Sequence, residues 1–133
     1  PRELMATIEA AKNCWPNRDL LVVFQPHRYS RTKDLFDDFV DLLSGIARLV
    51  ICEVYPAGEN PISGADGQSL CNAIESKSKF KPIFLENVLS LKKLLDSLLE
   101  GDDVLLTMGA GNIGKIAHSL LEHSAERTKS AHN

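Results

Sequence analysis

The chain has 133 residues, 44% of them hydrophobic and 25% charged, with a formal net charge of -3. Length and composition predict one soluble globular domain with a single core. The acidic balance argues against a protein that binds nucleic acid or an anionic membrane, and no apolar run reaches the roughly 20 residues needed to cross a bilayer.

The first third of the chain predicts two helices and two strands. A helix over residues 3–15 is indicated by an apolar stripe at helical spacing, made by Leu4, Ile8, Ala11 and Trp15. Residues 20–24 and 49–52 are short and apolar, which is typical of buried parallel strands. Between them, a second apolar stripe consists of Leu35, Phe39, Leu42 and Leu43. The aspartates on its opposite side are interpreted as a solvated helix face and not as a metal site.

The rest of the chain repeats this alternation. Residues 53–67 form the longest loop, and a loop of this length is usually functional or disordered. Its tyrosine, isoleucine and prolines favour an ordered loop. The later elements are a helix over 68–77, a strand over 82–85, a helix from a cap at Asn87 to Gly101, a strand over 104–108, and a last helix with Ile113, Ile116, Ala117 and Leu120 facing inward. Alternating strands and helices predict an α/β, three-layer domain, a mainly parallel sheet with helices on both faces.

The loop after the first strand is the first candidate site. Residues 24–32 read FQPHRYSRT, so His27, Arg28 and Arg31 lie where a strand passes into a helix. Ligands bind at this edge of α/β sheets. Two arginines three apart share one side of a helix, whose first N–H groups also attract anions. The loop therefore predicts a carboxylate or phosphate clamp; the alternative is that both arginines are simply solvated.

A glycine turn follows the last strand. Residues 109–115 read GAGNIGK, which matches G-x-G-x-x-G between a strand and a helix. No later strand carries the acidic residue of a dinucleotide site, and Ile116 stands where a phosphate-binding P-loop has Ser or Thr. Gly109, Gly111 and Asn112 are left as candidate contacts to a nucleotide or anion. Tight packing of the strand against the helix is the alternative.

The three cysteines, Cys14, Cys52 and Cys71, are unclustered. An odd number of scattered cysteines without metal-site spacing indicates reduced, structural thiols in a reducing compartment. The chain starts at Pro1 without an initiator methionine and without a signal-peptide pattern. We expect it to be a piece of a longer protein.

Three segments carry a family resemblance over essentially the whole chain: FQPHRYSRT at 24–32, EVYPAGE at 53–59 and GAGNIGK at 109–115. They resemble the carboxy-terminal domain of the Mur ligases, ATP-dependent amino-acid-adding enzymes of bacterial peptidoglycan synthesis. The form of the first segment is more similar to the branch that adds L-alanine to UDP-N-acetylmuramate than to the related ligase that recycles a murein tripeptide. The Asp-Tyr-Gly-His-His segment of the family, which precedes this domain, is absent.

The resemblance implies a Rossmann-like fold and residues 1–133 as one domain, the last of three. It implies that the whole enzyme activates the UDP-N-acetylmuramate carboxylate as an acyl phosphate, which the alanine amine attacks. Arg28 and Arg31 would bind the alanine carboxylate with His27 beside them, and Tyr55 and Glu59 would wall the pocket. ATP and Mg²⁺ would bind mainly to the central domain. The enzyme is expected in the cytoplasm, and this chain alone is expected to be inactive. Two other hypotheses stay open: an anion- or nucleotide-binding module, and a purely structural interaction domain.

Overall fold

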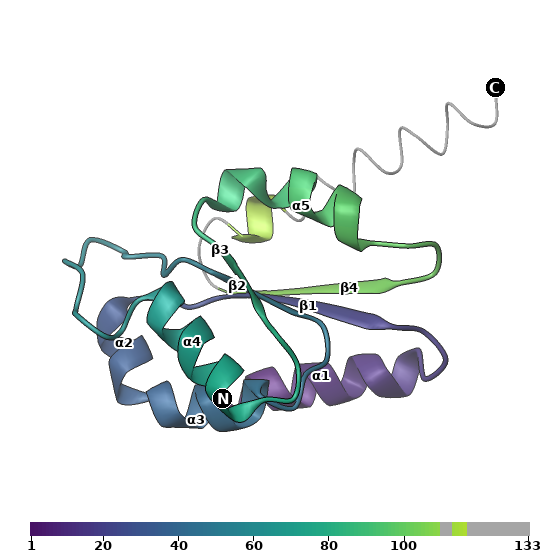
Figure 1. Ribbon diagram of the computed structural model, residues 1–133, viewed down its shortest axis with the longest axis horizontal. Coiled ribbons are helices and arrows are strands. Elements are labelled where there is room, and N and C mark those ends of the chain that lie inside the picture. Colours follow the sequence, from purple (N-terminus) through teal and green to yellow (C-terminus); the bar gives the residue numbers. More distant parts are fainter. Residues whose placement is uncertain (110–112, 117–133) are drawn as a thin grey trace.

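In the computed structural model, which describes residues 1–109 and 113–116, a parallel sheet lies between two layers of helices (Figure 1). Within this part the sheet has four strands in the order β3-β2-β1-β4. Their bounds are Leu20–Gln25 for β1, Leu49–Cys52 for β2, Ile83–Leu85 for β3 and Val104–Gly109 for β4. All three pairings are parallel. The predicted α/β fold with a mainly parallel sheet is confirmed.

The helices divide between the two faces of the sheet. Their bounds are Arg2–Cys14 for α1, Tyr29–Asp34 for α2, Phe36–Leu43 for α3, Gly67–Lys77 for α4 and Leu91–Leu98 for α5, which follows the 3-10 turn η1, Val88–Ser90. Residues 113–116 are also helical. In Figure 1, α1, α3 and α4 lie on one side of the sheet and α5 on the other.

The core follows from the alternation of side chains along β1. Val22 and Phe24 pack with buried residues of α1, α3 and α4, whereas Leu21 and Val23 pack with η1, α5 and Ile113. Successive residues of a strand point to opposite faces, so a wholly apolar strand supplies both cores at once. The predicted inward position of Ile113 is confirmed, since it is 1% exposed. Ala117 and Leu120 lie outside the described residues.

Several predicted details are wrong. Trp15 is 44% exposed, because α1 ends at Cys14 and the backbone of Trp15 at the C-cap (φ -131°, ψ 64°) is no longer helical. The helix expected around Leu35 is two helices, because the backbone angles of Leu35 (φ -107°, ψ 13°) depart from helical values between α2 and α3. Asn87 caps the 3-10 turn η1 and not an α-helix, and α5 ends at Leu98, before Gly101.

The connections place a topological switch point between β1 and β4. From β1 the chain moves outward to β2 and β3, and it then returns to pair β4 with the other edge of β1. Ligands of open α/β sheets bind in the crevice outside the carboxyl ends of the strands at such a point. In Figure 1 this end of the sheet lies on the left, with α2 and the loop after β2.

Candidate functional site

The loops that follow β1 and β2 stay paired beyond the sheet. His27 and Tyr55 form an isolated parallel bridge. The Tyr55 N–H donates to the carbonyl of Pro26 at 2.9 Å, and the Arg28 N–H donates to the carbonyl of Tyr55 at 2.8 Å. The rings of His27 and Tyr55 are stacked, with centroids 5.7 Å apart and planes at 11°. The two loops therefore extend the sheet and form one rim, as expected from its parallel strands.

The start of α2 is tied to the loop after β2 by a carboxylate. Glu59 Oε1 accepts from the Ser30 N–H at 3.1 Å, and Oε2 accepts from the Ser30 hydroxyl at 2.5 Å. These two hydrogen bonds hold the pKa of Glu59 below its usual value, and the bond from the Ser30 hydroxyl has the larger effect. Glu59 thus occupies an N–H donor that the sequence argument assigned to a bound anion.

Arg28 adopts a backbone conformation that is unusual for a residue with a side chain. Its φ is 70° and its ψ is 139°, so it lies ahead of α2 and not within it. Non-glycine residues held in such regions cost about 1–3 kcal/mol and cluster at functional sites. Because Arg28 is not helical, the argument that Arg28 and Arg31 share one helical face does not hold in this structure.

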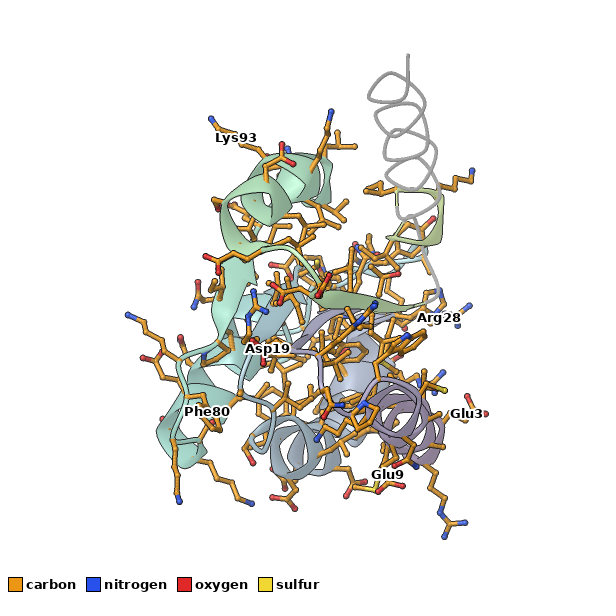
Figure 2. The ribbon with its side chains drawn as sticks, turned by 90° about the vertical axis from the view of Figure 1, so that its right-hand side faces the viewer. Glu3, Glu9, Asp19, Arg28, Phe80 and Lys93 are labelled. Carbon is orange, nitrogen blue, oxygen red and sulfur yellow. The ribbon has the colours of Figure 1, made fainter. Side chains whose placement is uncertain are left out.

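A cleft of about 380 Å³ opens at the switch point. β1, α2 and the loop between them contribute Phe24, Gln25, His27, Arg31 and Thr32; β4 contributes Thr107, Met108 and Gly109; α1 with its N-cap residue, and α3, contribute Pro1, Glu3, Leu4, Thr7 and Phe39. The cleft therefore brings together Arg31, His27 and Gly109 among the predicted site residues. The described lining does not include Arg28, Tyr55 or Glu59. Figure 2 shows Arg28 on the opposite side of the molecule from Phe80, a residue of the loop before β3.

The cleft combines both charges with apolar walls. Arg31 and His27 provide a guanidinium and an imidazole, Glu3 provides a carboxylate, and two phenylalanines and Met108 provide apolar surface. Guanidinium groups bind carboxylates through two parallel hydrogen bonds, and ligand sites typically pair a few such polar groups with an apolar lining. This set of side chains suits a small ligand that carries both charges, such as an amino acid.

Gln25 is a site residue that the sequence reasoning missed. It is 4% exposed, and its Nε2 donates to the carbonyl of Glu53 at 3.3 Å. Its Oε1 is buried and has no hydrogen-bond partner among the described residues. The available signal was a glutamine at the end of an otherwise apolar strand, since a buried amide needs partners for both of its ends.

Glu53 also escaped the sequence reasoning. Its Oε1 accepts from the N–H groups of Val54 and Gly67, each at 2.8 Å, at the point where α4 begins. Asp66 caps the same helix by accepting from the Ser69 N–H at 2.7 Å. The pKa of the Tyr29 phenol is raised, mainly because the phenol is buried and to a lesser extent because Glu53 and Asp66 carry negative charge nearby. Glu53 thus connects the two ends of the loop after β2, and Asp66 caps the helix that follows the loop.

The glycine turn is described only in part. Gly109 ends β4, pairs with Gln25 and has a φ of 150°. A Cβ there would lie 2.7 Å from the Gln25 carbonyl oxygen, so the position requires glycine for a close approach of the two strands. Gly111 and Asn112 lie outside the described residues.

Two other properties bear on the kind of site. In residues 1–109 and 113–116, no group of three or more metal-ligating side chains could hold an ion. The same part of the chain has no helix that is long and apolar enough to cross a membrane.

Comparison with known proteins defines the class. The model of the family described as Mur ligase, glutamate ligase domain, matches residues 1–111. The chain belongs to this family of ligase domains. It is similar to the UDP-N-acetylmuramate–L-alanine ligase of Methylococcus capsulatus (strain ATCC 33009 / NCIMB 11132 / Bath), with 51% identity over 122 residues. The aligned region covers 92% of this chain and 26% of that relative, so the chain spans about a quarter of its length.

Proposed function

We propose that this chain is the carboxy-terminal, amino-acid-binding domain of a three-domain, ATP-dependent ligase that adds L-alanine to UDP-N-acetylmuramate. The observation that carries the proposal is the cleft at the switch point, which joins Arg31 and His27 to Glu3. The 51% identity to a ligase of that name supports this choice of amino acid and acceptor.

In this proposal the residues of the chain position the substrate. Arg31 binds the alanine carboxylate, and His27, held against Tyr55, lies beside it. Arg28 is exposed next to His27 and supplies a second guanidinium when alanine is bound. Each charged hydrogen bond contributes about 1.5–3 kcal/mol. Holding the amine in line with an acyl phosphate accelerates the reaction further, because orientation replaces a bimolecular encounter.

ATP and Mg²⁺ belong mainly to the rest of the enzyme in this proposal. The cleft offers one arginine, one imidazole and a single carboxylate, and the described residues hold no cluster suited to a metal ion. Gly109, Gly111 and Asn112 are proposed to approach the nucleotide through their backbone. The UDP-linked substrate and ATP place the reaction in the cytoplasm, in peptidoglycan synthesis that supports cell shape and division. The isolated chain is inactive.

Steady-state kinetics of the full-length ligase test the assignment of Arg31. Arg31→Ala should raise the KM for L-alanine about 10- to 100-fold, which corresponds to the loss of one charged hydrogen-bonding group. The KM for ATP should stay within about twofold, and Arg31→Lys should be intermediate, because an ammonium cannot form the paired contact.

Lys33→Ala is the matched control for this test. Lys33 is an exposed cation on the same helix, and it is not part of the cleft lining. Its loss should leave the alanine KM unchanged. Equal alanine KM values for the wild type, Arg31→Ala and Lys33→Ala would refute the assignment of Arg31.

A further inference from the structure

A tight turn in the loop after β2 directs Glu59 toward α2. The Glu59 N–H donates to the carbonyl of Pro56 at 3.0 Å, which closes a four-residue turn. Its two central residues, Ala57 and Gly58, have φ values of 51° and 87°. Positive φ at both positions defines a type I′ turn, in which glycine, asparagine and aspartate are usual and alanine is strained. Despite this strain, the turn brings Glu59 to Ser30.

Both oxygens of the Glu59 carboxylate take part in this contact. One oxygen accepts from the N–H of Ser30 and the other from its hydroxyl. Ser30 lies between Arg28 and Arg31, and Glu59 itself does not line the described cleft. A side chain that binds the protein with both oxygens serves to fix the backbone, in the same way as a helix cap.

Glu59 fixes the start of α2, directly after the strained backbone of Arg28. The Arg28 N–H is bound to the Tyr55 carbonyl, and the Arg28 carbonyl accepts from the N–H and the hydroxyl of Thr32 at 3.2 and 2.8 Å. Without the Ser30–Glu59 bonds, the peptide at Arg28 could relax toward an ordinary conformation. That relaxation would rotate the start of α2, and with it Arg31, away from His27.

We propose that Glu59 is a positioning residue of the amino-acid site, which holds Arg31 and His27 in register through its two hydrogen bonds to Ser30. This inference rests on the proposed function. In this inference Glu59 acts through Ser30 and not by contacting the amino acid, which is a different role from the pocket wall that the family resemblance implies.

Kinetics of the full-length ligase separate this role from a general loss of structure. Glu59→Ala should raise the alanine KM about tenfold, with kcat changed by less than about threefold and the KM for ATP unaltered. Glu59→Gln should restore the alanine KM to within about threefold of the wild type, because an amide can accept from the N–H and donate to the hydroxyl of Ser30. Asn60→Ala, an exposed neighbour, is the control and should behave as the wild type.

Ser30→Ala is a second variant that tests the inference even if Glu59→Ala fails to fold. It removes the hydrogen bond from the Ser30 hydroxyl to Glu59 and keeps the one from the Ser30 N–H. It should raise the alanine KM about threefold, and its effect should not add to that of Glu59→Ala. A purely structural role would lower kcat through loss of active enzyme and leave the alanine KM unchanged, and this result would overturn the inference.

If Arg31→Ala raises the alanine KM and neither Glu59→Ala nor Ser30→Ala does, the proposed function stands and the inference fails. If Arg31→Ala also has no effect, the proposed function fails.

Discussion

Gly67 determines how closely α4 can approach β2. A Cβ at this position would lie 2.8 Å from the carbonyl oxygen of Cys52 and 2.9 Å from Cα of Glu53. Both are backbone atoms that cannot move aside without disturbing the strand. The Gly67 N–H also donates to the Glu53 carboxylate, so displacement of the helix would break that bond as well.

We therefore predict that Gly67→Ala destabilises this chain by about 1–3 kcal/mol, the usual cost of overpacking. Urea unfolding measures the change as a lower midpoint at constant slope. Gly45→Ala is the matched control, because the nearest atom to its Cβ would be 4.0 Å away. Gly45→Ala should be neutral or slightly stabilising, since alanine reduces the entropy of the unfolded chain. Equal midpoints for the two variants would contradict the packing argument.

At the scale of residues, the sequence identified the basic side chains of the site but not what holds them. His27 and Arg31 are recognisable because charged residues follow a buried strand. Glu59 was placed near the site for its position in the loop, and the structure directs its carboxylate to Ser30, 29 residues away. A sequence carries no local signal for such a long-range pairing. Glu53 was missed for the same reason, whereas Gln25 had a visible signal as a glutamine at the end of an apolar strand.

At the scale of elements, Arg48 ties together three segments at the end of the sheet opposite the cleft. Its Nη1 donates to Asp103 at 2.9 Å, just before β4, and its Nη2 donates to the Leu98 carbonyl at 2.6 Å, at the end of α5. Asp103 also accepts from the N–H of Glu100. Both hydrogen bonds lower the pKa of Asp103, and the bond from the Glu100 N–H has the larger effect.

This arrangement predicts a pH-dependent effect of Arg48→Ala. Because the pKa of Asp103 is depressed on folding, its stabilising contribution is present above the unfolded pKa, about 3.9, and is lost as the pH falls through the folded value. Arg48→Ala should lower the urea midpoint at pH 7, and its deficit relative to the wild type should shrink below about pH 4. Arg18→Ala, at an exposed position, serves as the control. A deficit that is constant from pH 7 to pH 3 would contradict the role given to Asp103.

The elements themselves were largely predictable. Wholly apolar runs and helical stripes located all of the described strands and the centres of the long helices. The break at Leu35 was not predictable, because the apolar stripe continues through it and only the backbone at one residue departs from the helix. Trp15 fits the stripe of α1 in sequence, yet it lies beyond the last helical residue and stays exposed. Periodicity thus locates an element better than it locates its ends.

At the scale of the whole molecule, the cleft lies at the place where the topology of the sheet puts it. β1 and β4 are neighbours in the order β3-β2-β1-β4, but the helices that follow them pack on opposite faces of the sheet. The loops after β1 and β4 therefore diverge, and the ligand-binding crevice of such sheets lies between them. The sequence predicted this shared edge from the alternation of strands and helices. It could not predict that Arg28 would lie outside the cleft, because that depends on one peptide with a positive φ.

ADP release by the full-length ligase, supplied with ATP, UDP-N-acetylmuramate and either L-alanine or a murein tripeptide, tests the proposed function most directly. We expect ADP release to require L-alanine and the UDP-sugar product to gain the mass of one alanine residue. ADP release that depends on the tripeptide and not on L-alanine would contradict it, and would assign the chain to the recycling branch of the family.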